Sequence, residues 1–347
     1  MNSLDLPDAC AQPEGGPDAG VAWHFGDPLS EQRWLVEGTA VVDLSDRGVI
    51  RVEGPDRLTW LDDLTTAKVS RLPPGESRVA LILSPHGRVE HELHLVDDGD
   101  ATWLIVEPGT VHALVGYLNS MRFLLSVDVI DASEQFGVLG DLSGERSVAV
   151  RPESVVHWTA PAEFAGTGLT ESGADRGGSA DRYVPNRPGV FPAREWVMPR
   201  RSIAAALQAA PHRAGTWAWE AVRVAAAVPR IGMETDARSL PHEVGWIGSA
   251  VHLAKGCYRG QEAVARTHNM GRPPRRLVLL HLGSSDELPA HGTVVRVGGS
   301  SVGWIATSAI HFELGPISTA VVKRSVPSDA EVEVDGATAT QVCVVVA

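Results

Sequence analysis

The stretch Lys255-Gly256-Cys257-Tyr258-Arg259-Gly260-Gln261-Glu262 is the most distinctive part of the sequence. Its cysteine stands between two basic residues, and a helix-compatible segment follows Gly260 and ends before Gly271. Positive charge and the unpaired N–H groups of a helix start both stabilise an anion, so this setting favours the thiolate form of Cys257. The residues alone leave two interpretations open, a reactive or ligand-binding thiol and a buried, inert one.

The other two cysteines, Cys10 and Cys343, complete a set of three with no CxxC spacing. Neither a disulfide framework nor a self-contained zinc or iron–sulfur site is therefore predicted, and we predict no metal ligands. Cys343 lies in an apolar run that is typical of strand packing. This cysteine usage indicates a reducing compartment.

The charge balance restricts the classes of partner. Lys plus Arg number 30 and Asp plus Glu number 43, which gives a formal net charge of -13. Such an excess of negative charge opposes general binding to nucleic acid or to an anionic membrane surface. No apolar run approaches the roughly 18 residues of a transmembrane helix, and the first residues lack a secretory pattern. We expect a cytoplasmic protein with no direct nucleic-acid partner and no membrane partner.

The length of 347 residues exceeds what one hydrophobic core usually organises, so several sub-domains are expected. Residues 1–20 are rich in Pro, Gly, Asp and Ala and predict a disordered tail. Over residues 21–272, strands and helices are interspersed without regular βαβ repetition, which predicts the α+β class, with a variable loop segment at 151–192. Short β segments over 273–347 predict a C-terminal β-barrel.

The run at 255–262 resembles the signature Lys-Gly-Cys-Tyr-x-Gly-Gln-Glu of the YgfZ family, folate-binding and iron–sulfur-linked relatives of the glycine-cleavage T-protein aminomethyltransferase. Further similar segments cover roughly residues 40–330: Val42-Asp43-Leu44-Ser45, Gly54-Pro55-Asp56, Pro85-His86-Gly87-Arg88-Val89, Leu240-Pro241-His242-Glu243 and Val322-Lys323-Arg324. The resemblance implies a T-protein-like folate-binding fold, with three sub-domains around a central cavity that holds tetrahydrofolate in relatives.

The resemblance also implies a function and a set of site residues. The implied role is support of iron–sulfur cluster assembly or repair, and indirectly of tRNA modification, with Cys257 as the central residue. Folate contacts are implied for Lys255, Gly256, Tyr258, Arg259, Gly260, Gln261, Glu262 and Arg223. The implied partners are a folate-like small molecule and iron–sulfur proteins.

Two segments depart from the pattern of the relatives. Arg223-Val224-Ala225-Ala226-Ala227 stands where folate-binding relatives have Arg-x-Glu-Ala-Gly, so Ala225 replaces the carboxylate expected to accept from two pterin N–H groups. His91-Glu92-Leu93 stands where relatives have Asp-Asp-Leu, and one-carbon transfer needs a positioned acidic group. Three functions therefore stay open: a YgfZ-like accessory protein, a folate-dependent aminomethyltransferase, and a cavity scaffold that has lost folate binding.

The segment from Glu90 to His94 combines acidic residues with histidines. Strand alternation places Glu90, Glu92 and His94 on one face and His91 on the other. We interpret these side chains as strand packing in preference to a metal site.

Overall fold

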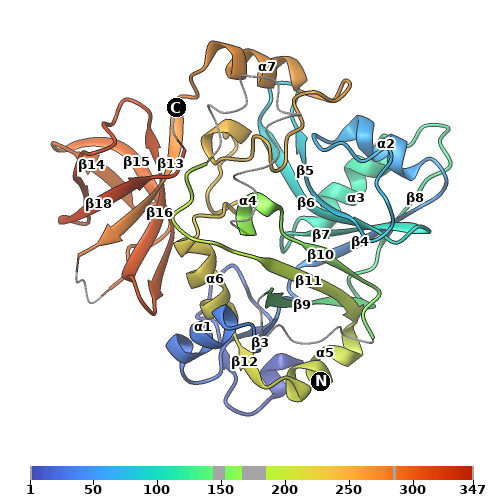
Figure 1. Cartoon of the computed structure of the whole chain (residues 1–347), viewed down its shortest axis with the longest axis horizontal. Helices are drawn as coiled ribbons and strands as arrows, with labels where there is room; N and C mark the ends of the chain where they lie inside the picture. Colours follow the sequence, from blue (N-terminus) through green and yellow to red (C-terminus); the bar gives the residue numbers. More distant parts are fainter. Residues whose placement is uncertain (1, 144–152, 166–184, 284–286, 346–347) are drawn as a thin grey trace. The chain divides into compact units, whose positions relative to one another are not determined.

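The computed structural model describes residues 2–143, 153–165, 185–283 and 287–345, and Figure 1 shows its helices and strands. The chain divides into two compact units. Unit 1 comprises Met1–Leu81, His91–Pro161 and Pro192–Trp219, and unit 2 comprises Ile82–Glu90, Ala162–Phe191 and Glu220–Ala347. Helices and strands are interspersed along the chain, as the predicted α+β class requires.

A first five-stranded sheet lies mostly in unit 1. Its strands, in spatial order, are β5 (Ser77–Leu83), β6 (Val89–Asp97), β7 (Ala101–Val106), β4 (Gly48–Glu53) and β8 (Asp128–Asp131). Helices α2 (Arg57–Leu64) and α3 (Val111–Ser120) contact this sheet. The tip of the β5–β6 hairpin, residues 82–90, belongs to unit 2.

A second five-stranded sheet completes unit 1. Its strands, in spatial order, are β10 (Val156–Thr159), β11 (Ala193–Pro199), β9 (Phe136–Leu142), β3 (Ala40–Asp43) and β12 (His212–Ala214). The β12–β3 pair is parallel and the other pairs are antiparallel. The neighbouring helices are α1 (Pro28–Val36), η3 (Arg200–Ser202), α5 (Ile203–Ala209) and α6 (Thr216–Ala225), the last of which continues into unit 2.

The N-terminal residues differ from the predicted disordered tail. They form the 3-10 turn η1 (Ser3–Asp5) and the short strand β1 (Cys10–Ala11), which pairs with β2 (Ala22–His24). Leu6 is buried in a core cluster that includes Val41 and Leu139. Ordered residues therefore precede Val21. The Leu6 side chain packs in a core formed by residues from distant parts of the sequence, and this contact anchors the N-terminal segment.

The predicted C-terminal barrel is confirmed. Its six strands close in the order β13 (Arg275–Leu282), β16 (Gly315–Lys323), β15 (Ser300–His311), β14 (Val294–Val297), β17 (Val332–Val334) and β18 (Ala337–Cys343). One apolar cluster fills the barrel with residues such as Val278, Ile305 and Ala320. A second cluster packs Leu277 and Leu279 against residues 221–227.

The rest of unit 2 carries little regular structure. It contains α4 (Ala162–Ala165), η4 (Pro241–Glu243) and α7 (Gln261–Met270). The predicted variable segment 151–192 falls partly outside the described residues, and its described part includes β10 and α4. In the part of the chain that the structure describes, no helix has the length and apolar character to cross a membrane. The ring of three sub-domains around a cavity stays a prediction.

Candidate functional site

Cys257 lies on the loop that leads into α7 and is exposed as a free thiol. The predicted helix after Gly260 is confirmed, because α7 starts at Gln261 and ends at Met270. Gly260 and Gly271 flank this helix with left-handed φ angles of 83° and 76°. Glycine adopts this conformation without a steric penalty, so the two glycines fix where the helix begins and ends.

Close packing between two turns of unit 2 fixes the start of α7. A β carbon added to Gly260 would lie 2.5 Å from the Ser84 carbonyl oxygen, and one added to Gly87 would lie 2.9 Å from the β carbon of Ala263. The turn at 84–87 therefore packs directly on the first residues of the helix. Only glycine fits at these two positions, and the path of the Cys257 loop follows from that contact.

The basic residues beside Cys257 make contacts of their own. The guanidinium of Arg259 pairs with the Glu90 carboxylate at 2.9 Å. The Lys255 Nζ lies 5.5 Å from the ring centroid of Tyr258, within the range of a cation–π interaction. Lys255 and Tyr258 are both buried, and burial raises the pKa of Tyr258 to about 12. The loop thus exposes its sulfur while side chains on both sides of it are anchored.

The other predicted contact residues of this run vary in exposure. Gly256 and Glu262 are exposed, and Gln261 is half-buried. The Gln261 side-chain amide donates to the backbone carbonyl of Lys255 at 3.4 Å, which links the helix start back to the loop. The run from 255 to 262 therefore alternates between exposed and buried residues, and the hydrogen bond from Gln261 joins its two ends.

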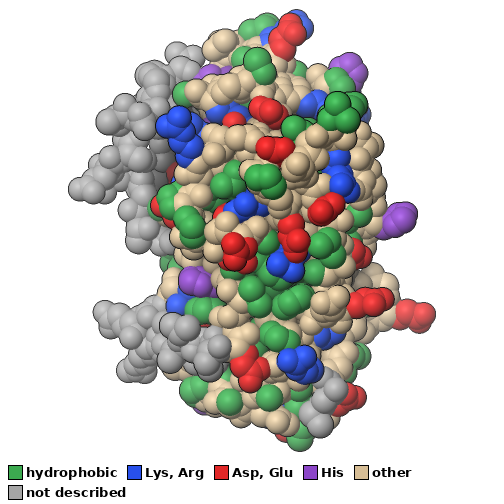
Figure 2. Space-filling model, turned by 90° about the vertical axis from the view of Figure 1, so that its right-hand side faces the viewer, with side chains coloured by type: hydrophobic (Ala, Val, Ile, Leu, Met, Phe, Trp, Pro, Cys, Tyr) green, Lys and Arg blue, Asp and Glu red, His purple; other side chains and the backbone are tan. Residues whose placement is uncertain are grey.

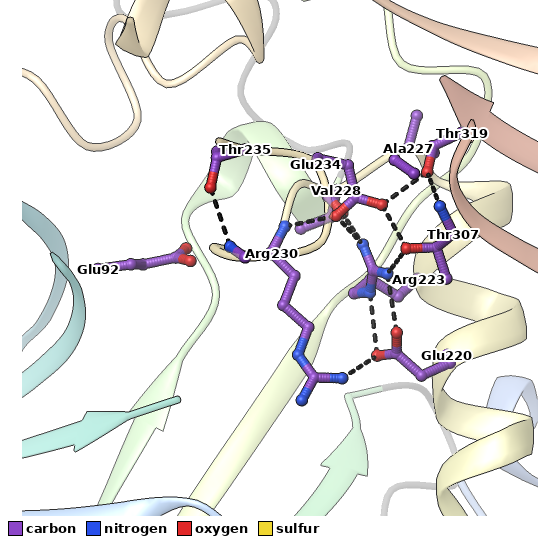
Figure 3. Close-up of polar contacts among 12 residues, drawn as sticks. Glu92, Glu220, Arg223, Ala227, Val228, Arg230, Glu234, Thr235, Thr307 and Thr319 are labelled. Carbon is purple, nitrogen blue, oxygen red and sulfur yellow. Dashed lines mark hydrogen bonds and ion pairs between the residues drawn. The ribbon is translucent and has the colours of Figure 1, made fainter. Parts of the chain in front are cut away.

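Arg223 lies in a buried polar cluster of unit 2 (Figure 3). Its Nε and Nη2 donate to the two carboxylate oxygens of Glu220 at 3.0 and 2.8 Å. Its remaining N–H groups donate to the Val228 carbonyl at 2.6 Å, Glu234 at 3.0 Å and the Thr307 hydroxyl at 3.0 Å. A guanidinium has five N–H donors, and these contacts use all of them.

Glu234 is the centre of the same cluster and is fully buried. Its Oε1 accepts from the hydroxyls of Thr307 at 2.7 Å and Thr319 at 2.6 Å, which lie on β15 and β16. Its Oε2 accepts from Arg223 and from the backbone N–H of Arg230 at 2.9 Å. Although burial lowers the pKa of Arg223, the negative charges of Glu220 and Glu234 raise it overall, so Arg223 stays charged. The cluster ties α6 and the loop after it to the barrel.

The folate contact implied for Arg223 stays a prediction. All five of its N–H groups are engaged within unit 2. Ala225, two residues further on, packs in the apolar cluster with Leu277 and Leu279. The pair at positions 223 and 225 therefore does not fit a pterin ring, which needs a carboxylate acceptor there.

A second charged cluster lies in unit 1 and brings together distant segments. Arg47, which precedes β4, forms an ion pair with Glu195 on β11. The other oxygen of Glu195 lies 2.8 Å from Nδ1 of His94 on β6, and Nε2 of His94 lies 3.8 Å from Glu92. The imidazole stacks on Trp158 of β10 with ring centroids 3.8 Å apart. The result is a chain of alternating charges, Arg47, Glu195, His94 and Glu92.

The electrostatics of this cluster keep His94 protonated. Burial lowers the pKa of His94, but the charge of Glu195 and hydrogen bonds to Glu195 and Glu92 outweigh it and raise the pKa to about 9. Burial raises the pKa of Glu195, but the charges of Arg47 and His94 lower it to about 2. Glu92 therefore lies beside a cation at neutral pH.

Only part of this cluster can be predicted from the sequence. Strand alternation places Glu92 and His94 on one face of β6, and the structure agrees. Nothing in the sequence linked them to Arg47 or Glu195, because that contact depends on the pairing of separate sheets. Among the described residues, no group of three or more His, Cys, Asp or Glu side chains is arranged to hold a metal ion.

Comparisons with known proteins bear on the fold. Residues 21–164 match the family model of the GCVT N-terminal domain. The structure superimposes on the glycine cleavage system aminomethyltransferase T of Bartonella henselae with a TM-score of 0.74 and 16% identity, covering 98% of this chain and 94% of that one. The chain has the T-protein fold. The predicted T-protein-like fold is confirmed by this superposition and by the closed barrel.

Relatives by sequence carry names of group-transfer enzymes. An aminomethyltransferase of Symbiobacterium thermophilum is 26% identical over 315 residues, which is 86% of this chain and 81% of that protein. A chloroplastic protein of Arabidopsis thaliana named as a transferase is 26% identical over 298 residues, which is 81% of this chain. The chain spans 65% of the length of the Arabidopsis protein. Proteins named as aminomethyltransferases are therefore among the sequence relatives of this chain.

Proposed function

We propose that this chain is a YgfZ-type accessory protein that supports iron–sulfur cluster assembly or repair, and through it tRNA modification, with Cys257 as its working group. The observation that carries the proposal is the exposure of Cys257 between anchored neighbours. Lys255 and Tyr258 are buried and Gly260 is locked against Ser84, so the sulfur is held in place and open to a partner. A thiol that reacts or binds a ligand needs this access, whereas a packing cysteine does not.

A folate ligand is part of this proposal, but it has to use residues other than Arg223 and Ala225. The T-protein fold supports a folate-like ligand in general. Arg223 contacts Glu220 and Glu234, and Ala225 packs among apolar side chains, which supports a folate site built from other residues. Lys255, Arg259 and Gln261 remain the proposed contacts beside the cysteine.

A second candidate is folate-dependent one-carbon transfer, and one observation favours it. Glu92 takes the place of an acidic position in the relatives, and it lies buried beside the protonated His94. One-carbon transfer needs a positioned acidic group, and Glu92 is an acidic side chain held in place by its contact with His94. The names of the relatives point in the same direction.

The test compares two variants in cells that lack the native protein, with the activity of an iron–sulfur enzyme as the readout. Cys257→Ser should abolish rescue, whereas Glu92→Gln should keep it. Cys10→Ser is the matched control, because Cys10 is also an exposed cysteine and is expected to be neutral. Full rescue by Cys257→Ser would remove the proposed role of this thiol.

The purified protein separates the remaining alternatives. Titration with tetrahydrofolate, followed by tryptophan fluorescence, should show saturable quenching. Absence of binding would favour the cavity scaffold that has lost folate. Consumption of a methylated amine in the presence of tetrahydrofolate, lost in Glu92→Gln, would replace the accessory role with one-carbon transfer.

A further inference from the structure

Unit 1 contains a cavity of about 310 Å³ whose lining residues all belong to that unit. The end of β3, the loop after it, η3 and the start of α5 form one wall, with the side chains of Asp43, Ser45, Arg200, Arg201 and Ile203. The N-terminal segment around η1 forms the other wall. A cavity of this volume is large enough for a small organic ligand.

Two arginines give the cavity cationic donors. The Nε of Arg200 donates to the Ser133 carbonyl at 3.0 Å, and its Nη2 donates to the carbonyls of Ser45 and Ser133 at 3.0 and 2.8 Å. Within the described residues, Nη1 of Arg200 and the guanidinium of Arg201 donate to no protein group. A fixed guanidinium with free N–H groups, next to a second one, suits a carboxylate ligand.

A buried carboxylate lines the same cavity. Asp43 is the last residue of β3 and is 3% exposed. Its Oδ1 accepts from the Ser45 N–H at 3.0 Å, and in the described part of the chain no group donates to its Oδ2. A buried carboxylate oxygen without a donor costs free energy. A ligand that brings an ammonium group to Asp43 would therefore be bound by a charge-assisted hydrogen bond.

The opposite charges of the cavity do not pair with each other. No ion pair among the described residues joins Asp43 to Arg200 or Arg201. Asp43 is held by the Ser45 N–H and Arg200 by two backbone carbonyls, so neither can turn toward the other without losing these hydrogen bonds. The cavity therefore offers a ligand one anion-binding and one cation-binding group at the same time.

The N-terminal wall of the cavity is anchored to the rest of unit 1. The Asn2 backbone N–H donates to the Asp5 carboxylate at 2.7 Å, and the Asn2 side-chain amide donates to the Gly20 carbonyl at 2.9 Å. Leu6 packs in the same core cluster as Ile203. Both walls are therefore in place before a ligand arrives, which reduces the entropy lost on binding.

The outer surface offers a charged ligand a less selective setting. On the face in Figure 2, acidic and basic side chains are interspersed. Contacts between exposed charges are weakened by water and salt, whereas the Asp43 carboxylate is buried. Selective binding of a small charged molecule is therefore expected at the cavity.

We propose that this cavity binds a free α-amino acid. The carboxylate of the ligand would face Arg200 and Arg201, its ammonium group would face Asp43, and its carbon chain would lie against Ile203. A purely anionic ligand is disfavoured because it would bring a second negative charge to the Asp43 carboxylate. The inference does not depend on the role of Cys257.

The first test titrates the full chain with each of the standard amino acids by isothermal titration calorimetry. At least one of them should bind saturably. Acetate, ethylammonium and inorganic phosphate each carry charge of one sign only, so each should bind at least about 10-fold more weakly than the best amino acid. Absence of amino-acid binding, or binding of acetate or phosphate that is as tight, would overturn the proposal.

The second test locates the site with the amino acid that binds best. Arg201→Gln should weaken its binding at least about 10-fold, because a charge-assisted contact to the ligand carboxylate is lost. Arg71→Gln is the matched control, since Arg71 is also an exposed arginine of unit 1 but does not line the cavity. Equal affinities of the two variants would show that the ligand binds elsewhere.

A third variant tests the orientation of the ligand. Asp43→Asn removes the charge but keeps an oxygen that accepts from the Ser45 N–H, so it should weaken amino-acid binding at least about 10-fold and leave acetate binding no weaker. The melting temperature of each variant reports whether the fold is kept, and the exposed position of Arg201 makes its variant decisive if Asp43→Asn is destabilised. Unchanged amino-acid affinity in folded Asp43→Asn would contradict the proposal.

Discussion

The cluster around Arg223 and the loop around Cys257 both carry residues that a family signature marks, yet the structure treats them in opposite ways. Arg223 has every N–H donor engaged by other groups of unit 2, while Cys257 is exposed and its neighbours are anchored. A residue in a family motif can therefore serve contacts within the protein alone. The two regions differ in whether their functional atoms are accessible: the Cys257 sulfur is exposed, and the Arg223 guanidinium is not.

The largest loss of stability is expected from a substitution in the Arg223 cluster. Glu234→Ala removes the acceptor of four hydrogen bonds and leaves Arg223 and two threonine hydroxyls with unmet contacts in the interior. Breaking a buried ion pair in this way should lower the free energy of unfolding by about 3–5 kcal/mol. Urea denaturation of the variant and the wild type measures this difference in the free energy of unfolding.

The control for this prediction is Glu333→Ala, an exposed carboxylate on barrel strand β17, which should change stability by less than about 0.5 kcal/mol. If both variants lose the same small amount of unfolding free energy, the Arg223 cluster does not stabilise the fold. Arg223 would then be available again as a ligand contact.

The next largest change in stability is expected in the unit 1 cluster, which differs from that of Arg223 because it contains a histidine whose pKa is raised on folding. The pKa of His94 is raised from its ordinary 6.5 to about 9 in the folded chain. Its contribution to stability is therefore complete below about pH 6.5 and is lost as the pH rises to 9. We expect a loss of about 2–3 kcal/mol over that interval.

His94→Gln isolates this contribution from other titrating groups. The difference in unfolding free energy between wild type and variant should shrink steadily from pH 6.5 to pH 9, as measured by urea denaturation at each pH. A constant difference would mean that the pKa of His94 is not raised on folding. Glu92 would then have no neighbouring cation.

The sequence predicted the parts of the molecule that local rules control. Gly260 and Gly271 gave the bounds of α7, and short β segments gave the barrel. Contacts between residues far apart in the sequence could not be predicted in this way. Leu6 packs in a core that includes Leu139, so residues 1–20 are not the disordered tail that their composition predicts. Arg223 is engaged by Thr307 and Glu234, which no spacing rule connects to it.

A smaller loss of stability is expected from a substitution that tests whether the contact between Gly260 and Ser84 positions the Cys257 loop. Gly260→Ala forces a β carbon to within 2.5 Å of the Ser84 carbonyl at a φ of 83°. The expected loss of stability is about 1–2 kcal/mol. Hydrogen exchange should also become faster in the first turn of α7.

Gly256→Ala is the matched control, because its added β carbon would meet no heavy atom within 4 Å and its φ lies outside the left-handed region. It should leave both the stability and the exchange rates of α7 close to wild type. Equal effects of the two substitutions would show that the loop is sensitive to any added side chain, and that the contact with Ser84 does not position Cys257.

The smallest effect is expected at Cys257 itself. Its side chain is exposed, so Cys257→Ser exchanges one atom at the surface and should change the free energy of unfolding by less than about 0.5 kcal/mol in urea denaturation. Any loss of rescue in cells would then come from the chemistry of the sulfur and not from unfolding. A loss of stability as large as that of Gly260→Ala would instead show that the thiol packs against the protein. The contrast with the Arg223 cluster would then disappear.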